Sequence, residues 1–560
     1  MGIQFTLPEF FKRYSKDQTV EELESIDLDA LAHAQQKVEH DLTRWQAAKR
    51  YKNVCFYTFV IVWTMVMWGY EGTAGAMLVA IPQFREDFGY EYEGSYVLEA
   101  KWQSAISGGP AASMTVAFIL GSYFSDIFGR RKILLVASMF SLPWITIQFV
   151  ATSIELFFAG KFMNGFALGA LSACCSTYIS EISPLALRGI SSTLLSISMS
   201  TGPFICVLIN NTTSTYTSRM AYRGIFIPQW VFACTAIMLQ CFIPESPYWL
   251  LSKDRKKDAI KNLRRMFDNE ADVQAQYALM SVTVEEAKAI SSKAGTYIDC
   301  FRKKDFRRTW LTAFAFVMQA FSGVAYVGSY STYYFELSGF DTQKSFSMTC
   351  VCQALSISGV ITAIFLVDRV GRRKLLITGM ILITICNLLV ACLGLNKSNQ
   401  PAMTASSAFL ILYNYIYNIG IGPVPYILGN ELSSVFLRAK TISMGNALNN
   451  AMQTMWSVVL PYMFNTNEGN MGSKINFIFT GLSFVSIFIF YIYLPETAHR
   501  SFEEIDEMFA LGIPARHWAS YKTEKEAISD KAFADVKTEE NQVENNMMEP
   551  AEKSSVSSIV

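Results

Sequence analysis

The sequence predicts an all-α membrane protein with twelve transmembrane helices in two six-helix halves that are related as parallel repeats. Of the 560 residues, 51% are hydrophobic and only 17% are charged. The apolar residues form blocks long enough to cross about 30 Å of hydrocarbon as helices. Short charged patterns also occur once in each half of the chain. This composition is too apolar for a soluble enzyme of the same length.

The composition also excludes several classes of function. The 47 Lys and Arg residues are balanced by 47 Asp and Glu residues, so no general basic face is available for nucleic acid. The eleven Cys residues lie mostly inside apolar runs and form no Cys-x-x-Cys pair, which does not fit a metal centre. Because no nucleophile-base set is apparent either, we expect neither an enzyme nor a bound cofactor.

Each half of the chain contains six expected helices. A polar N-terminal segment, residues 1–53, precedes the first half at 54–243, a polar central loop covers 244–309, and the second half covers 310–494. The C-terminal tail, 495–560, is expected to be mostly disordered, with too little apolar surface beyond about residue 515 to fold. The expected spans are 54–80, 104–124, 133–152, 154–179, 190–210, 224–243, 310–337, 346–367, 374–395, 403–429, 440–464 and 474–494.

The charges of the short loops predict the orientation in the membrane. Cations follow helices 2, 4, 8 and 10, whereas the loop after helix 1 is rich in acids such as Glu86 and Glu91. Because cytoplasmic loops carry an excess of Lys and Arg, both termini are expected in the cytoplasm of a plasma-membrane protein. Sequons at Asn210 and Asn396 then fall on the outer side as candidate glycosylation sites.

Three charged patterns occur twice at similar offsets. The repeated residues are Asp126 with Arg130 and Asp368 with Arg372, Glu181 with Arg188 and Glu431 with Arg438, and Glu245 and Glu496. This repetition implies two homologous halves in parallel orientation, a feature of one class of secondary transporter. The alternative for each arginine taken alone is that it only fixes the orientation in the membrane, as cytoplasmic cations do. As a set, these residues are expected to form an ion-pair latch that closes the inner gate and breaks when the halves rock.

These residues resemble the sugar porter family of the major facilitator superfamily over residues 55–510. The resemblance rests on SDIFGRRK (125–132), GKFMNGFALG (160–169), YISEISPLALRG (178–189), PESPYWLL (244–251), VDRVGRRK (367–374) and PETAHRSFEEIDEMF (495–509). Within the family, GSYSTYYFELSGF (328–340) and AYRGIFIPQW (221–230) look like the fungal maltose and general α-glucoside permeases. The resemblance implies import of maltose-like sugars, driven by a proton gradient without a cofactor, by a monomer in the lipid bilayer.

Two buried charges are the candidates for proton coupling. Glu71 in helix 1 lies about 15 Å, and Lys161 in helix 4 about 10 Å, from the outer ends of their helices at 1.5 Å per residue. These depths are compatible with a pair, and such charges are costly in hydrocarbon unless they face a partner or a wet cavity. In proton-coupled sugar porters the matching positions hold an Asp and an Arg. The resemblance therefore implies that Glu71 binds the proton and that Lys161 is its counter-charge; the alternative is a fixed structural pair.

Candidate sugar contacts follow from the family positions, since sugars present hydroxyls to polar groups and C–H faces to aromatic rings. For each position the alternative is a hydrogen bond between helices. Departures from the family pattern, such as Ala320 and Ala325, remove hydrogen-bonding reach and favour a larger or less polar ligand than a monosaccharide. The candidates are Ser196, Gln319, Tyr330, Asn418, Tyr426 in the stacking position, Asn449 and Gln453.

Two further expectations concern movement and function. Gly-Pro-x-Pro at 422–425 interrupts helix 10, because proline has no backbone donor, and it should form a moving element of the outer gate. Besides a proton-coupled importer, the sequence allows an uncoupled hexose facilitator or an exporter of another small polar metabolite. A sugar sensor that does not transport is a third reading.

Overall fold

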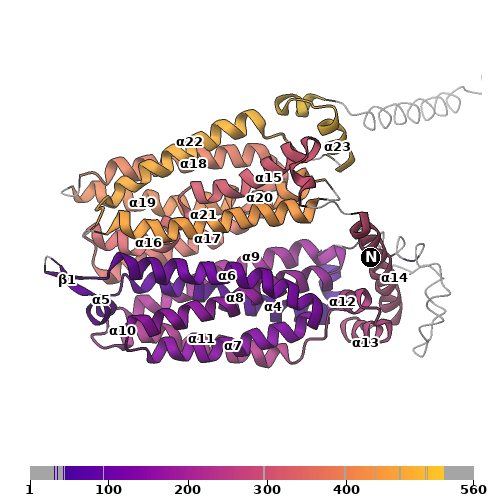
Figure 1. Cartoon of the computed structure of the whole chain (residues 1–560), viewed down its shortest axis with the longest axis horizontal. Helices are drawn as coiled ribbons and strands as arrows, with labels where there is room; N and C mark the ends of the chain where they lie inside the picture. The colour runs from indigo at the N-terminus through magenta and orange to yellow at the C-terminus, as the bar shows by residue number, and fades with distance from the viewer. Residues whose placement is uncertain are drawn as a thin grey trace, which may run out of the picture.

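The computed structural model describes residues 44–521 except positions 93, 294–296, 397–398, 435–436, 466–467, 499 and 501, together with residues 31, 35, 39 and 42. Two bundles of long helices lie side by side, one from each half of the chain (Figure 1). The predicted all-α membrane fold is confirmed. Ten of the expected spans are helices long and apolar enough to cross a membrane, counted over the described residues.

The first bundle is built on close packing of α6 against α8 and of α4 against α9. Gly169 allows the first contact, because a Cβ there would lie 2.8 Å from the Cβ of Ala117. Small residues are the usual means by which membrane helices approach closely. The elements are α4 (Lys52–Leu78), α6 (Ala100–Phe128), α7 (Arg130–Val150), α8 (Ile154–Ile182), α9 (Leu185–Thr213), α10 (Met220–Arg223), η2 (Gly224–Phe226) and α11 (Ile227–Gln240).

The second bundle contains two interrupted spans. The first breaks at Gly323, whose φ of 95° is left-handed, and the second breaks at a π-helical turn before Pro423. Two of the expected spans, 403–429 and 440–464, are not among the ten membrane-crossing helices counted over the described residues. The π-helical turn divides the first of them, and the polar residues of α21 make the second less apolar. The elements are α15 (Lys303–Phe321), α16 (Val324–Leu337), α17 (Thr342–Val370), α18 (Arg372–Leu393), α19 (Gln400–Ile416), η4 (Tyr417–Ile421), α20 (Val424–Leu432), α21 (Arg438–Phe464), η5 (Gly472–Lys474) and α22 (Ile475–Tyr493).

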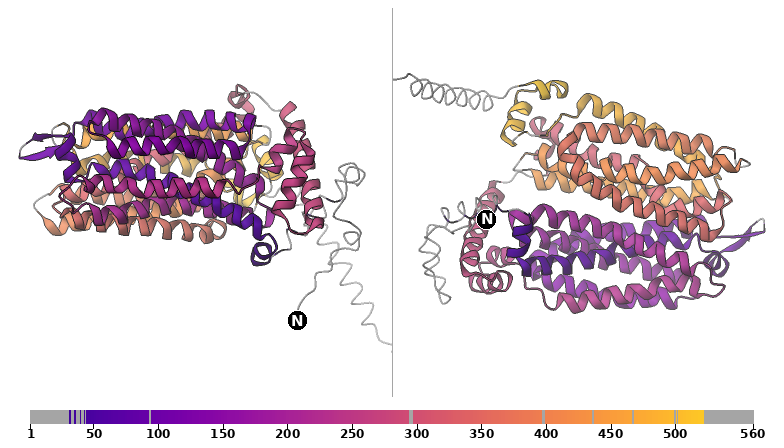
Figure 2. Two further views of the ribbon diagram at one scale, coloured as in Figure 1. Left: turned by 90° about the horizontal axis from the view of Figure 1, so that it is seen from below. Right: turned by 180° about the vertical axis from the view of Figure 1, so that it is seen from behind.

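The two ends of the molecule carry different short elements. At one end, which we call the hairpin end, α5 (Pro82–Phe88) precedes two antiparallel strands, β1 (Tyr90–Tyr92) and β2 (Ser95–Val97), paired with Tyr90 opposite Val97. The sequence did not predict this hairpin. At the other end, which we call the basic end, α12 (Pro247–Ser252), α13 (Lys256–Met266) and α14 (Glu270–Lys293) pack beside the bundles (Figure 2).

Segments from both termini dock at the basic end. Arg50 in α3 (Arg44–Arg50) donates to Asp272 of α14 with an Nε–Oδ2 distance of 3.0 Å, and this bond raises the pKa of Arg50. After α23 (Phe502–Ala510), the turn η6 (Ala515–Ser520) buries Trp518 against Phe509. The turn at 515–520 lies just past the expected limit of about residue 515, because this tryptophan supplies apolar surface there. Residues 522–560 lie outside the described residues.

Candidate functional site

Glu71 and Lys161 form a buried ion pair between α4 and α8. Lys161 Nζ lies 2.6 Å from Glu71 Oε1, and the two side chains are 2% and 4% exposed. Gly75, one turn after Glu71, makes room for the lysine, since a Cβ there would lie 3.2 Å from Lys161 Cε. The pairing that the two depths indicated is thus present in the structure. An ion pair so fully removed from solvent needs each charge compensated by hydrogen bonds.

Gln229 supplies the third member of this cluster. It lies in α11, and its Nε2 donates to Glu71 Oε2, the oxygen that Lys161 leaves free. The carboxylate is therefore held from both sides by helices of the same half. Sequence reasoning missed Gln229, although an amide inside an apolar span is a detectable signal.

A cavity of about 100 Å³ lies beside the ion pair and is lined by both halves. Ser107 of α6 and Ser329 of α16 supply polar atoms to its wall, next to Glu71 and Lys161. Because a water molecule occupies about 30 Å³ in the liquid, the cavity has room for a few waters. Pockets for small ligands are usually about 300–1,000 Å³, so in this conformation the cavity is too small for a disaccharide.

Three of the expected sugar contacts form one hydrogen-bonded chain in the second half. Asn449 Nδ2 donates to Gln319 Oε1 over 2.9 Å, and Gln453 Nε2 lies 3.4 Å from Asn449 Oδ1. Gln319 Nε2 in turn donates to the main-chain carbonyls of Ile421 and Gly422 over 3.1 and 2.8 Å. The structure brings these three side chains together at the break between α19 and α20, the two parts of the tenth expected span.

The other expected sugar contacts are dispersed. Tyr330 is buried, and its hydroxyl lies 3.5 Å from Ser107 Oγ of the other half. Asn418 donates to Asn414 O of the preceding turn. Tyr426 packs edge-on against Phe316. Ser196 is exposed on α9 and donates to the carbonyl of Ser192, so it does not join the chain centred on Gln319.

The halves are joined by polar contacts toward the hairpin end. Arg85 Nη2 of α5 lies 3.2 Å from Glu336 Oε2 at the end of α16, and the Arg85 guanidinium also lies over the Tyr333 ring. Ser347 Oγ of α17 donates to Asn211 Oδ1 of α9 over 3.0 Å. Ser104, Asn465 and Thr332 also contact the opposite half, at Val458 O, Leu98 O and Met77 Sδ. The hairpin end is therefore closed.

The repeated charges gather at the basic end in two matching clusters. In the first half, Arg130 Nη2 lies 2.8 Å from Glu181 Oε1 and 2.9 Å from Asp126 Oδ1. Glu245 Oε1 accepts the main-chain N–H groups of Arg130 and Arg131 over 2.8 and 3.1 Å. The carboxylate thus caps the N-terminus of α7, where unpaired donors and the helix dipole favour a negative charge. Gly129 makes this possible through a φ of 101°, in a space that Glu245 fills.

The second cluster repeats this arrangement. Arg372 Nε lies 3.2 Å from Glu431 Oε1, and Glu496 Oε1 accepts the N–H of Arg372 over 3.0 Å at the start of α18. Thr497 Oγ1 donates to Glu431 Oε2 over 2.5 Å. We expected these charges to latch the two halves to each other. The ion pairs of Arg130 and Arg372 instead join helices of one half, because each acid comes from the same repeat as its arginine.

The other residues of the expected latch are Arg188, Arg438 and Asp368. Arg188 is exposed at the start of α9, and Arg438 is half-buried at the start of α21. The side chain of Asp368 lies outside the described residues. The break at 417–425 is present, and the helix that follows it, α20, carries Glu431 to Arg372 at the basic end. Its expected role as a moving element of the outer gate stays a prediction, because the break lies between α19 and α20 in the middle of the span.

The two expected glycosylation sites differ in exposure. Asn396 is exposed in the turn after α18. Asn210 is fully buried inside α9. A sugar chain cannot be attached there without breaking the helix packing, so the structure argues against Asn210 as an acceptor.

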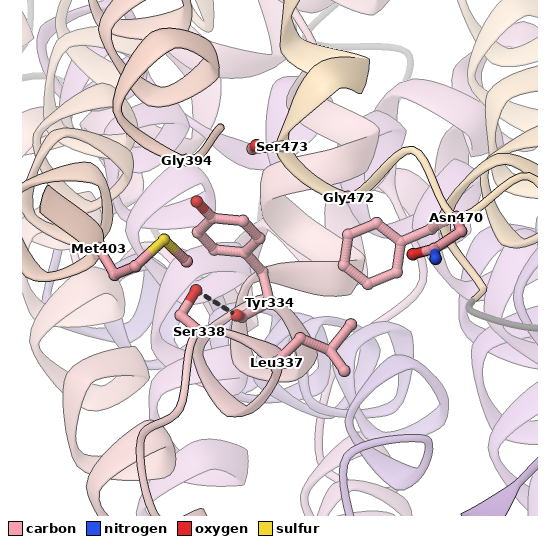
Figure 3. A pocket seen from close by; sticks show the side chains of 9 residues that line it. Tyr334, Leu337, Ser338, Gly394, Met403, Asn470, Gly472 and Ser473 are labelled. Carbon is pink, nitrogen blue, oxygen red and sulfur yellow. Dashed lines mark hydrogen bonds between the residues drawn. The ribbon is translucent and has the colours of Figure 1, made fainter. Parts of the chain in front are cut away.

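A second, smaller cavity lies near the hairpin end of the second bundle. Figure 3 shows Tyr334, Ser338, Met403 and Ser473 around it, with the hydroxyl of Ser338 bonded to the Tyr334 carbonyl over 2.7 Å. Its volume of about 40 Å³ has room for little more than one water molecule. None of the expected sugar contacts lines it, so the cavity beside Glu71 is the better candidate site.

Comparisons of the sequence identify related proteins over most of the chain. Residues 57–509 match the family model described as sugar (and other) transporter. A general alpha-glucoside permease of Saccharomyces cerevisiae is 29% identical over 512 residues, 89% of this chain and 83% of the relative. An alpha-glucosides permease of the same organism is 30% identical over 488 residues, 85% of this chain and 81% of the relative. A maltose permease of that yeast is 28% identical over 508 residues, 89% of this chain and 82% of the relative.

Solved structures share the fold. The xylose transporter XylE from E. coli in an inward-open conformation aligns with a TM-score of 0.65 and 18% identity, over 81% of this chain and 99% of that chain. Its partially occluded inward-open conformation aligns with a TM-score of 0.64 and 19% identity, over 80% of this chain and all of that chain. At these identities the likeness establishes the fold alone.

Proposed function

The chain belongs to the sugar (and other) transporter family, and we propose that it imports α-glucosides, such as maltose-like di- or oligosaccharides, together with protons by alternating access. The similarity to yeast α-glucoside and maltose permeases supports this class of substrate. In this proposal the protein works as a monomer in the plasma membrane. The basic end and both termini face the cytoplasm, in keeping with the excess of cations in cytoplasmic loops.

The observation that carries the proposal is the Glu71–Lys161 pair beside a cavity between the halves. A carboxylate at this depth is costly without its partner, so protonation of Glu71 and movement of Lys161 away from it must accompany each other. The cavity offers waters a place from which a proton could reach Glu71. If the halves rock about this cavity, the proton is taken from one side and released to the other.

The sugar is proposed to bind on the second-half side of the same space, near the chain of Gln319, Asn449 and Gln453. On α16 of the second half, Ser329 lines the cavity and the hydroxyl of Tyr330 lies 3.5 Å from Ser107 Oγ of the first half. A substrate held there would contact both halves, as alternating access requires.

The basic-end clusters have a different proposed role. Because Arg130 and Arg372 bind acids of their own halves, the clusters brace each bundle so that it moves as one body. The contacts that must break when the other face opens are then those of the hairpin end, above all the Arg85–Glu336 pair.

Replacing Glu71 by Gln tests proton coupling. The Glu71→Gln variant should lose uphill accumulation of labelled maltose and keep exchange of maltose across the membrane, because the neutral amide neither binds nor releases a proton. Uptake of labelled maltose, glucose and raffinose in a transporter-deficient cell, with and without a protonophore, measures both properties. Asp272→Asn is the matched control, since it neutralises a buried carboxylate of α14 that lies outside this cavity and should retain accumulation. Full accumulation by Glu71→Gln would exclude the proton role.

A second candidate function is an uncoupled facilitator or exporter. It is favoured by the complete bonding of Glu71, whose two oxygens are held by Lys161 and Gln229, as in a fixed structural pair. Uptake by the unmodified protein that survives collapse of the proton gradient would establish this alternative.

A further inference from the structure

The break between α19 and α20 leaves the carbonyl of Ile421 without the main-chain donor that a continuous helix would give it. The backbone stays in the right-handed helical region at Ile416, Gly422 and Pro423. In such a backbone the N–H of residue 425 would donate to the carbonyl of Ile421, four residues earlier. Residue 425 is a proline, which has no N–H to donate. A buried carbonyl that is left unpaired costs roughly 1–3 kcal/mol.

Gln319 supplies the missing donor from a different helix. Its Nε2 donates to Ile421 O and to Gly422 O, so both amide hydrogens are committed to this break. Its Oε1 is held by Asn449, and the residue is only 4% exposed. The amide of α15 therefore takes the place of the main-chain donor that Pro425 removes.

The segment beyond the break connects this amide to the basic end. α20 spans Val424–Leu432, and its penultimate residue, Glu431, is bonded to Arg372 and Thr497. A change in the angle of α20 at the break would therefore be transmitted to the charge cluster of the second half.

We propose that Gln319 is a positioning residue that couples sugar occupancy to movement of α20. In the empty carrier its amide holds the break in the observed bend. A bound sugar hydroxyl competes for Nε2, releases the carbonyls of Ile421 and Gly422, and lets α20 change its angle. This inference rests on the proposed function only in placing the sugar near Gln319.

A double-mutant cycle separates the two roles of the amide. Gln319→Met keeps the size of the side chain and removes its donors. Pro425→Ala restores an N–H that can reach Ile421 O, whereas Pro423→Ala is the matched control, because its new N–H would be directed at Ile419 O. The measured quantities are the maximal rate and the half-saturating concentration of maltose uptake, corrected for the amount of protein at the cell surface.

We expect Gln319→Met to lower the maximal rate roughly tenfold and to raise the half-saturating concentration. In the Pro425→Ala background the loss of rate should shrink to within about threefold, while the weaker apparent affinity persists because the sugar contact is still missing. In the Pro423→Ala background the tenfold loss should remain. Equal effects of Gln319→Met in all three backgrounds would overturn the inference.

A second measurement distinguishes a failure of the proposed transport function from a failure of the role of Gln319 at the break. If the unmodified protein takes up no α-glucoside, the same cycle is measured as the midpoint of thermal unfolding of the solubilised protein. Gln319→Met should then lower the midpoint, and Pro425→Ala, unlike Pro423→Ala, should relieve most of that loss. A loss that Pro425→Ala does not relieve would overturn the role of Gln319 at the break.

Discussion

The charged pairs at the hairpin end and at the basic end differ in which parts of the molecule they join. At the hairpin end, Arg85 and Glu336 come from different halves and are 16% and 9% exposed. At the basic end, Arg130 and Glu181 come from the same half and are 7% and 8% exposed. The first kind of pair can break when the halves separate, whereas the second keeps one half intact. The partner, and not the charge itself, decides whether an ion pair acts as a gate or as a brace.

The repeat explains why the braces occur twice. Each cluster contains an arginine that begins a helix after a left-handed glycine, Gly129 or Gly371, and an acid that caps that helix, Glu245 or Glu496. All members of a cluster lie inside one repeat unit. The contact between the halves at Arg85–Glu336 is instead made by α5 of the first half and the end of α16 of the second.

The largest expected effect comes from breaking a brace. Arg130→Ala leaves the buried carboxylate of Glu181 without its partner and should lower the free energy of unfolding by about 3–5 kcal/mol. Unfolding of the solubilised protein by denaturing detergent measures this change. Arg130→Lys keeps the charge but not the fork of donors, so it should lose less. A loss below about 1 kcal/mol for Arg130→Ala would mean that the cluster does not brace the first half.

An intermediate effect is expected from opening the gate. Arg85→Ala leaves the buried carboxylate of Glu336 without its partner in the closed conformation. It should shift the balance toward a conformation open at the hairpin end by about 1–2 kcal/mol, roughly a factor of 5 to 30. The readout is the labelling rate of Thr332→Cys by a membrane-impermeant thiol reagent, compared with protein that lacks this cysteine. Thr332 is suitable because it is buried against Met77 of the other half.

Two controls sharpen the same comparison. Exchange of the charges, Arg85→Glu together with Glu336→Arg, should restore slow labelling. Arg372→Ala at the basic end should not accelerate it, since that arginine pairs with Glu431 of its own half. Faster labelling in Arg372→Ala than in Arg85→Ala would reverse the assignment of gate and brace.

The smallest effect is expected at Arg188. As a member of the latch that the repeated charges predicted, Arg188 would hold the inner gate closed, and its loss would favour the inward-open state. Its exposure at the start of α9 changes that expectation, because substitutions at exposed sites usually alter stability by less than about 0.5 kcal/mol. Arg188→Ala should therefore leave both the detergent unfolding curve and the labelling of Thr332→Cys unchanged. Slower labelling in Arg188→Ala, as expected if the carrier shifted toward the inward-open state, would restore Arg188 to the latch.

Most of the fold was predictable from the sequence, because span length, apolar composition and the repeated motifs are local properties of the chain. The pairing of Glu71 with Lys161 was also accessible, since a constant rise per residue converts sequence position into depth. Two buried charges of opposite sign at similar depth have a strong reason to meet. The hairpin at 90–97 was not predicted, because each strand has only three residues, too few for an alternating pattern to be recognised.

Which helix faces meet is decided only in the tertiary structure. Depth placed Glu71, but the approach of α11 decided that Gln229 holds its second oxygen. The motifs identified Arg130, but the packing of α7 against α8 decided that its acid is Glu181 of the same half. The prolines at 423 and 425 predicted a break, while the position of α15 decided that Gln319 fills it. The sequence alone determines how far along its own helix each group lies, whereas its partner depends on rotations and neighbours that many distant contacts set together.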